Sequence, residues 1–234
     1  MTTACRNLKK VTHVLFDMDG VLLDSEVLYK RAISKIASRF GKVYTAEIRS
    51  KLLGSPEREC SKIAVEEMKL PMSVDKFQLE FRRLAHSYMA SVSLMPGARH
   101  LVTHLKTHKI PIAVATSSSR ESYDLKTKDH KEFFCMFDHI VTGASDPEVK
   151  QGKPSPDIFL VCASRFPDSP CSEKCLVFED APNGVLAAVR AGMQVIMVPD
   201  ENIPPEHTKE AHVVIKNLEE APIEYFGLPP LKKL

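Results

Sequence analysis

The feature that most constrains the fold is an apolar run that ends in two aspartates, VLFDMDG at residues 14–20. Three large apolar residues, Val14 to Phe16, are typical of a buried strand. Asp17 and Asp19 follow directly, and neighbouring carboxylates repel each other and resist removal from water. Bound Mg²⁺ relieves both costs, because it prefers carboxylate oxygens. Taken alone, these residues also fit an Asp-Gly turn.

The rest of the chain predicts two regions of different architecture. Residues 25–91 show helical periodicity throughout, with helices expected over 25–40, 45–53, 55–68 and 73–91. After the strand expected at 11–16, the other strands fall after residue 96, at 110–115, 139–141, 175–178, 194–198 and 212–215. They alternate with helices expected over 98–108, 121–134, 156–166 and 183–191.

This alternation predicts an α/β fold, a Rossmann-like parallel sheet with helices on both faces. The all-helical block is then an insertion after the first strand. We therefore expect a core domain of residues 1–24 and 93–234, and a helical cap domain of residues 25–92.

Three further polar motifs follow predicted strands. Each has an ordinary explanation when it stands alone: a serine-rich helix cap, a solvated lysine in a turn, or acids that cap a helix. Parallel strands bring their carboxyl ends to one edge of the sheet, where ligands bind. Together the four motifs supply a nucleophile, an acid, a cation site and phosphate anchors, which are the parts needed for phosphoryl transfer. The three motifs are Thr116-Ser117-Ser118-Ser119, Gly152-Lys153-Pro154 and Glu179-Asp180.

In this order the motifs resemble those of the haloacid dehalogenase superfamily, in its phosphatase branch with a helical cap. The resemblance covers residues 11–226, and its most specific parts are DMDGVLLDSE at 17–26 and FEDAPNG at 178–184. Further agreement at 94–98, 130–134 and 226–229 is most similar to the animal pseudouridine-5′-phosphatases. The resemblance implies Mg²⁺-dependent hydrolysis of a small phosphomonoester, with pseudouridine 5′-phosphate as the expected substrate.

The resemblance also implies a role for each motif residue. Asp17 is expected to attack phosphorus and form an aspartyl-phosphate. Asp19 is expected to be protonated when substrate binds, to protonate the leaving group and then to activate water. The remaining roles are phosphate binding by Thr116, Ser117 and Ser118, bridging by Lys153, and Mg²⁺ binding by Asp17, the Asp19 carbonyl, Asp180 and Glu179, the last of which also fits an orienting role.

Specificity is expected to come from the cap. Gly54, Ser55 and Arg58 are the candidate substrate-binding residues there, although an ordinary helix cap and a solvated arginine fit them as well. The basic run at residues 125–131 is expected to be a solvated helix face, although it also fits contact with a polar part of the substrate.

Several other functions fit the same motifs. Related phosphatases that act on glycerol phosphate, sugar phosphates or flavin mononucleotide share the catalytic residues. The β-phosphoglucomutases carry a histidine at the position of Tyr29, so this chain departs from mutase chemistry. A catalytically silent, phosphate-sensing relative is the alternative outside enzymes, and the presence of both Asp17 and Asp19 argues against it.

Composition bears on partners and compartment. A net charge of +2 and the absence of a long apolar run make nucleic acid or membrane partners unexpected. Six scattered cysteines are typical of reduced thiols, and residues 1–10 are polar, so we expect a cytoplasmic protein. No long heptad pattern is present, and we expect a monomer.

Overall fold

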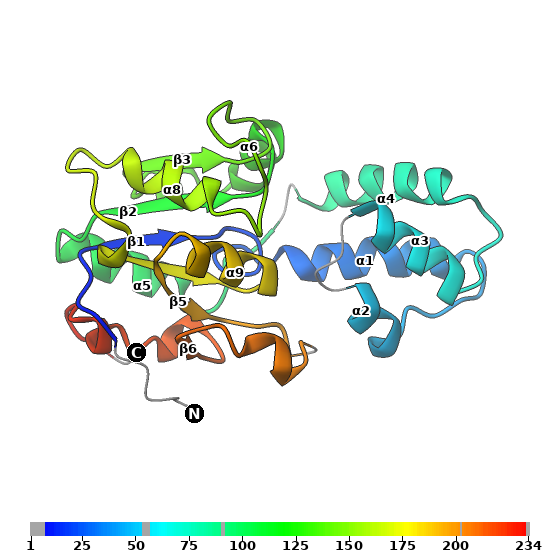
Figure 1. Ribbon diagram of the computed structural model, residues 1–234. Coiled ribbons are helices and arrows are strands. Elements are labelled where there is room, and N and C mark those ends of the chain that lie inside the picture. The colour runs from blue at the N-terminus through cyan, green and yellow to red at the C-terminus, as the bar shows by residue number, and fades with distance from the viewer. Residues whose placement is uncertain (1–7, 53–56, 90–91, 202, 233–234) are drawn as a thin grey trace.

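A six-stranded parallel sheet forms the centre of the computed structural model, which describes residues 8–52, 57–89, 92–201 and 203–232. The strand order is β3-β2-β1-β4-β5-β6, and every neighbouring pair is parallel. This confirms the predicted fold class, including the short last strand (Figure 1). The strands are β1 (His13–Phe16), β2 (Ile112–Thr116), β3 (His139–Thr142), β4 (Cys175–Glu179), β5 (Gln194–Met197) and β6 (Val213–Val214).

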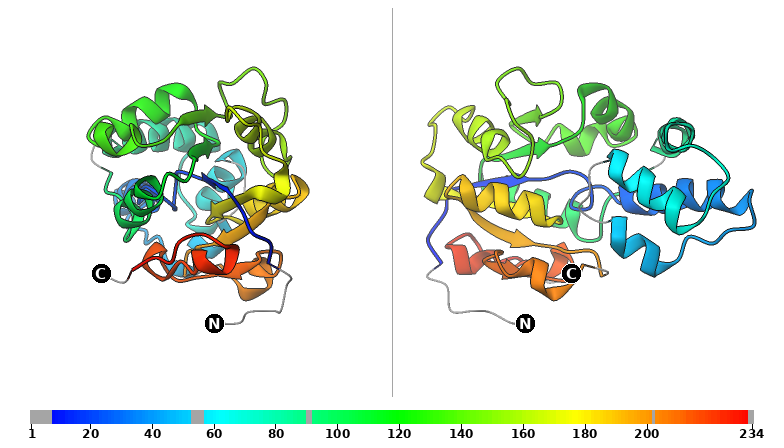
Figure 2. Two further views of the ribbon diagram at one scale, coloured as in Figure 1. Left: turned by 90° about the vertical axis from the view of Figure 1, so that its left-hand side faces the viewer. Right: turned by 45° about the vertical axis from the view of Figure 1, so that its right-hand side comes forward.

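Helices cover both faces of the sheet because successive side chains of each strand point to opposite faces. Leu15 and Val177 pack with the helices on one face, and Phe16 and Phe178 belong to the apolar cluster on the other. Figure 2 shows the helices on the two sides of the twisted sheet. The helices of this part are α5 (Ala98–Thr107), α6 (Arg120–Thr127), α7 (Lys131–Phe134), α8 (Asp157–Ser164) and α9 (Pro182–Arg190), with short 3₁₀ turns at Ser172–Lys174, Pro205–Thr208, Leu218–Glu220 and Ile223–Phe226.

One predicted helix is divided. The sequence pattern predicts a continuous helix over 121–134, but α6 ends at Thr127 and α7 begins at Lys131. At the break, His130 has a non-helical backbone (φ −122°, ψ 23°), and its ring Nε2 bonds to the carbonyl oxygen of Val92 at 2.6 Å.

Four helices follow β1 and lie beyond the carboxyl end of the sheet (Figure 1). They are α1 (Ser25–Ser38), α2 (Ala46–Leu52), α3 (Glu57–Glu67) and α4 (Val74–Met89), and we call them the four-helix unit. They share an apolar cluster of their own, in which Ile36, Ala64 and Phe77 are buried. An ion pair between Arg49 of α2 and Asp200, after β5, joins the unit to the rest of the chain.

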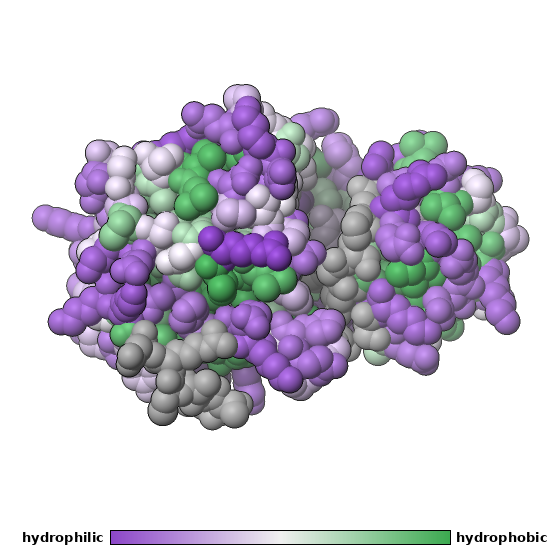
Figure 3. Space-filling model, in the orientation of Figure 1, coloured by the Kyte–Doolittle hydropathy of each residue, from purple (hydrophilic) through white to green (hydrophobic). Residues whose placement is uncertain are grey.

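Figure 3 shows a mostly hydrophilic face with small, separate apolar patches. In the described ranges, no helix has the length and apolar character needed to cross a membrane. The five cysteines within those ranges, Cys60, Cys135, Cys162, Cys171 and Cys175, are free thiols.

Candidate active site

The loop after β1 holds Asp17 at the edge of the sheet. The Asp17 N–H donates to the carbonyl of Phe178, 2.9 Å away, so the parallel ladder continues to this residue. The chain then turns sharply at Gly20, whose φ of +78° favours glycine. A Cβ at Gly20 would lie 2.1 Å from Oδ2 of Asp180. The glycine therefore allows the Asp180 carboxylate to lie directly against the Asp17 loop.

Lys153 connects three strands at this edge. Its Nζ donates to Asp17 Oδ1 at 2.5 Å, to Glu179 Oε1 at 2.6 Å and to the carbonyl of Ala115 at 3.2 Å. The lysine side chain is only 8% exposed. All three ammonium hydrogens thus have acceptors, and the lysine brings the ends of β1, β2 and β4 to one point.

Glu179 is enclosed more completely than the other carboxylates. Besides Lys153, it accepts hydrogen bonds from the N–H groups of Asp180 at 2.9 Å and Ala181 at 3.1 Å. A Cβ at Gly184 would lie 1.8 Å from Glu179 Oε1, so α9 begins directly on this carboxylate. These contacts favour an orienting role for Glu179, the second of the two roles expected from the sequence.

The serine-rich segment after β2 forms the start of α6. The Thr116 hydroxyl oxygen accepts from the Ser118 N–H at 3.1 Å, and Ser119 caps α6 by accepting from the Ser122 N–H. The Ser118 hydroxyl donates to Asp19 Oδ2 at 3.0 Å. Ser117 is exposed at the same edge. The structure therefore brings the predicted phosphate-binding segment next to both aspartates.

A functional residue that the sequence interpretation missed is Lys126. Its Nζ donates to Asp19 Oδ1 at 2.7 Å and Oδ2 at 2.8 Å, and to the Ser118 hydroxyl oxygen at 3.0 Å. The side chain is 2% exposed, so the expectation of a solvated basic face was wrong for this residue. Lys126 follows Ser119 by two helical turns and shares a buried face with Tyr123 and Thr127, and that spacing is the signal that could have found it.

The pKa values of the two aspartates are shifted in opposite directions. Burial raises the pKa of Asp17 to about 7, with further increases from the charges of Glu179 and Asp19, although Lys153 works against them. Burial also acts to raise the pKa of Asp19, but the charge and hydrogen bonds of Lys126 outweigh it, and the net pKa is lowered. Without substrate, Asp19 thus favours its ionised form because its nearest charge is a cation, and the expectation that it is protonated when substrate binds stays a prediction.

Among the predicted cap residues, the described one, Arg58, makes its contact away from these aspartates. Arg58 donates to Asp75 at 2.9 Å and is 72% exposed, so the solvated-arginine alternative describes it. Gly54 and Ser55 lie outside the described residues. Tyr29 packs against Phe81 inside the four-helix unit, with ring centroids 5.8 Å apart.

The donor set fits a Mg²⁺ ion held by few protein ligands. Within the described ranges, no three aspartate, glutamate, histidine or cysteine side chains converge as metal ligands. Asp180 nevertheless lies directly against Gly20, in the loop that begins at Asp17 and includes the main-chain carbonyl of Asp19. Two carboxylates and a carbonyl completed by water are the kind of site that Mg²⁺ occupies.

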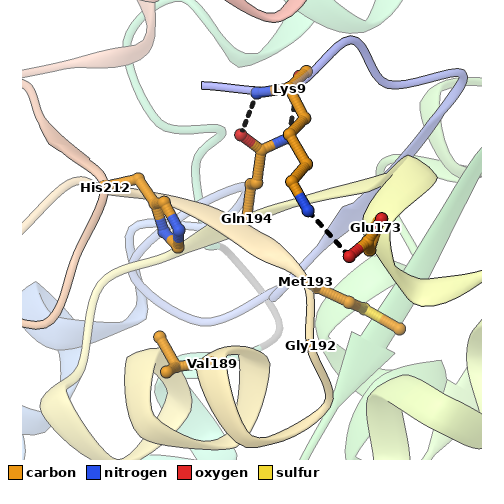
Figure 4. Close-up of a pocket in the computed structure, with 7 residues that line it drawn as sticks. All are labelled: Lys9, Glu173, Val189, Gly192, Met193, Gln194 and His212. Atoms are coloured by element: carbon orange, nitrogen blue, oxygen red, sulfur yellow. Dashed lines mark hydrogen bonds and ion pairs between the residues drawn. The ribbon is translucent and has the colours of Figure 1, made fainter. Parts of the chain in front are cut away.

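A pocket on the surface lies elsewhere. It is lined by Lys9, Glu173, Val189, Gly192, Met193, Gln194 and His212 (Figure 4). Gln194 begins β5, so this pocket is at the amino ends of the strands, opposite the aspartates. The Gln194 amide binds the main chain of Lys9 through two hydrogen bonds of 2.8 Å, which indicates a structural role in holding the N-terminal segment.

Comparison with known proteins agrees with this geometry. Residues 14–198 match the family model of the haloacid dehalogenase-like hydrolases, and the chain belongs to this family. It is 47% identical to the probable pseudouridine-5′-phosphatase of Drosophila melanogaster, over 95% of this chain and 96% of that protein. It is 44% identical to (DL)-glycerol-3-phosphatase 2 of Arabidopsis thaliana, over 95% and 93% of the two chains. With these relatives, the chain is a phosphoric monoester hydrolase.

Solved structures show the same fold. A haloacid dehalogenase family hydrolase from Deinococcus radiodurans, with bound phosphate and sodium, superposes with a TM-score of 0.80 at 22% identity, covering 94% of this chain and 98% of that one. The putative β-phosphoglucomutase of Thermotoga maritima gives a TM-score of 0.71 at 30% identity, covering 93% and 97%.

Proposed function

We propose that this protein is a Mg²⁺-dependent phosphatase that hydrolyses pseudouridine 5′-phosphate to pseudouridine and phosphate. The observation that carries the reaction type is the buried pairing of Asp17 with Lys153 at the carboxyl edge of the sheet. A carboxylate there is held in place as a nucleophile, and the adjacent serine-rich segment supplies N–H and hydroxyl groups for phosphate oxygens.

The reaction then proceeds in two displacements. An oxygen of Asp17 bonds to phosphorus while the bond from phosphorus to the ester oxygen breaks, and Asp19 gives its proton to that oxygen. Water next attacks the aspartyl-phosphate, Asp19 takes a proton from this water, and the bond between phosphorus and Asp17 breaks to release phosphate. Asp17, Asp180 and the Asp19 carbonyl are the groups that would hold Mg²⁺, which supplies positive charge opposite the phosphate when bound.

The charge of Asp19 must change during this cycle. Lys126 keeps Asp19 ionised before the substrate enters. The phosphate brings negative charge next to Asp19, which favours uptake of a proton from solvent water by this carboxylate. The ionised form is the one required in the second displacement.

The four-helix unit is proposed to act as a cap domain of residues 25–92 over a core of residues 1–24 and 93–234. The chain leaves the core after Asp24 and returns to it before Leu94. These two points lie close together, because Leu23, at the end of the Asp17 loop, forms a β-bridge with Leu94. Closure would exclude bulk water from the phosphate. The ion pair of Arg49 with Asp200 supports this role because it joins the unit to the core beyond the connections.

The substrate proposal is supported by the relatives. A second related protein, from Saccharomyces cerevisiae, is also named a probable pseudouridine-5′-phosphatase and is 35% identical over 88% of this chain. Glycerol phosphate is the runner-up, because the Arabidopsis glycerol-3-phosphatase is nearly as similar as the Drosophila relative. The free thiols favour a reducing compartment, and we propose the cytoplasm and a monomeric enzyme.

The test is a steady-state screen of phosphate release with Mg²⁺. Pseudouridine 5′-phosphate is compared with uridine 5′-phosphate, glycerol 3-phosphate, a sugar phosphate and flavin mononucleotide, and Asp17→Asn is the control. A preference in kcat/KM for pseudouridine 5′-phosphate that Asp17→Asn abolishes supports the proposal. A preference for another ester overturns the substrate, and release that persists in Asp17→Asn overturns the nucleophile.

A further inference from the structure

Lys126 is a buried lysine that the reaction steps above do not use. It lies on α6, outside the four motifs, and its ammonium is directed at the Asp19 carboxylate rather than at solvent. Burying a lysine is unfavourable unless its charge is paired, so the contact with Asp19 accounts for the position of this side chain.

The two buried lysines divide the carboxylates of the site between them. Lys153 contacts Asp17 and Glu179, whereas Lys126 pairs with Asp19 and with no other carboxylate among the described side chains. Asp17 and Asp19 are two residues apart on one loop, and separate cations hold them. Asp19 remains 27% exposed, so it faces the open side of the site while Lys126 holds it from the protein side.

Few other groups fix Asp19. The Ser118 hydroxyl donates to Oδ2, and the same hydroxyl accepts from Lys126. The hydroxyl of Ser25 is buried and lies close enough to help lower the pKa of the Asp19 carboxyl. If Lys126 lost its ammonium, Asp19 would keep only contacts with the serine hydroxyls, and its carboxylate could rotate.

The segment that carries Lys126 is itself anchored. Four residues after Lys126, in the break between α6 and α7, His130 bonds to the carbonyl of Val92 at 2.6 Å. Val92 lies in the connection that returns from the four-helix unit, and α6 also contacts α4. The segment around Lys126 is therefore itself fixed to the four-helix unit and its connection, so the position of Lys126 beside Asp19 is well defined.

We propose that Lys126 is a positioning residue that fixes the Asp19 carboxylate where it exchanges protons with the leaving group and with water. This inference rests on the proposed phosphatase function. Lys126 itself neither gives nor takes a proton in either displacement. A proton is transferred efficiently only within hydrogen-bond reach, and displacement of a catalytic group by about 1 Å costs on the order of 100-fold in rate.

This role predicts a dependence on the leaving group. An alkyl ester expels a strongly basic oxygen, which requires the Asp19 proton, whereas p-nitrophenyl phosphate expels a stable phenolate that does not. The quantity to compare is kcat/KM, because it covers only the steps up to aspartyl-phosphate formation and excludes the water attack common to all substrates.

The experiment compares Lys126→Met with wild type on p-nitrophenyl phosphate and on the alkyl ester that wild type prefers. Lys126→Met is expected to lower kcat/KM for the alkyl ester by about 10- to 100-fold and to change it less than about threefold for the aryl ester. The matched control is Lys128→Met, an exposed lysine two residues away, which should leave both values unchanged.

A mutant cycle with Asp19 completes the test. Asp19→Asn should show the same selectivity, and the double variant should be no worse than Asp19→Asn alone, since Lys126 acts through Asp19. Lys126→Gln keeps a hydrogen-bond donor, so its kcat/KM for the alkyl ester should lie between those of wild type and Lys126→Met. It replaces Lys126→Met in the comparison if circular dichroism shows that Lys126→Met is unfolded.

The outcomes separate the two proposals. A wild-type protein that hydrolyses no phosphate ester overturns the proposed function, and the role of Lys126 with it. An active wild type in which Lys126 variants lose the same factor on both esters overturns the positioning role alone. A rise in KM shared by both esters also overturns it, because Lys126 would then bind the phosphate directly.

Discussion

Replacement of Lys153 by methionine tests the charge balance of the site. Lys153 joins two carboxylates that are nearly fully buried, Asp17 and Glu179, at 2.5 and 2.6 Å. At an effective dielectric constant of 20, each such pair gains about 6 kcal/mol of Coulomb energy before desolvation is subtracted. Breaking a buried pair by removing one partner costs about 3 kcal/mol or more in unfolding free energy.

The size of the loss should depend on pH. The pKa of Asp17 is about 7, raised mainly by burial, and without Lys153 it would rise further because the lysine charge lowers it. Since a raised carboxyl pKa means that the folded state holds its proton more tightly than the unfolded state, this residue stabilises the fold at low pH and loses that contribution as pH rises through 7.

At pH 5.5 Asp17 is protonated with or without Lys153, so the variant loses mainly the interaction with Glu179. Glu179 also retains its two backbone donors. We expect Lys153→Met to lower the unfolding free energy by about 3 kcal/mol at pH 8 and by about 1.5 kcal/mol at pH 5.5. Phosphatase activity should fall by about 1,000-fold or more, because Asp17 is then protonated near neutral pH.

The assay is urea denaturation in EDTA at both pH values. The control is Lys106→Met, which breaks the exposed ion pair with Asp138 and should change the unfolding free energy by no more than about 1 kcal/mol at either pH. An unchanged unfolding free energy for Lys153→Met at pH 8, or an equal loss at both pH values, would refute this reasoning.

Three further predictions concern the metal loop and the four-helix unit. Gly20→Ala places a methyl against Asp180, so it should lower the free energy of unfolding by about 2 kcal/mol and raise the Mg²⁺ concentration for half-maximal activity. Gly152→Ala, with open space around it, should change neither quantity, and equal effects of the two substitutions would contradict this. Mg²⁺ should raise the melting temperature of wild type and not of Asp180→Asn, and a shift that survives the substitution would place the ion elsewhere. Arg49→Met should raise KM roughly two- to fivefold through loss of the contact with Asp200, as steady-state kinetics would show, and an unchanged KM would remove this pair from cap closure.

The positions of Asp17, Lys153 and Glu179 could be anticipated from the sequence because each follows a predicted strand or its connecting loop. Parallel strands have a common carboxyl edge, so residues far apart in sequence converge there once the sheet is predicted. The alternation of strands and helices along the sequence predicts a parallel sheet, and the structure confirms it.

Lys126 could not be recognised in this way. On a helix, a lysine near Lys128 and Lys131 is ordinarily solvated, and only the tertiary contact with Asp19 explains its burial. The same contact lowers the pKa of Asp19 in the substrate-free site, which the sequence pattern does not indicate. Helix 121–134 was predicted as continuous because periodicity does not report a side chain such as His130 that bonds to a distant segment.

The central claim is that Asp17 carries the phosphoryl group, and trapping that group is its most direct test. Asp19→Asn is mixed with p-nitrophenyl phosphate and Mg²⁺. The nitrophenolate leaves without an acid, so Asp17 can still be phosphorylated, whereas hydrolysis of the aspartyl-phosphate lacks its base and stops. The account predicts a burst of p-nitrophenol equal to the enzyme concentration and one phosphoryl group on the peptide that contains Asp17. Steady turnover by wild type, with no burst in the variant and no phosphoryl group on that peptide, would contradict the account.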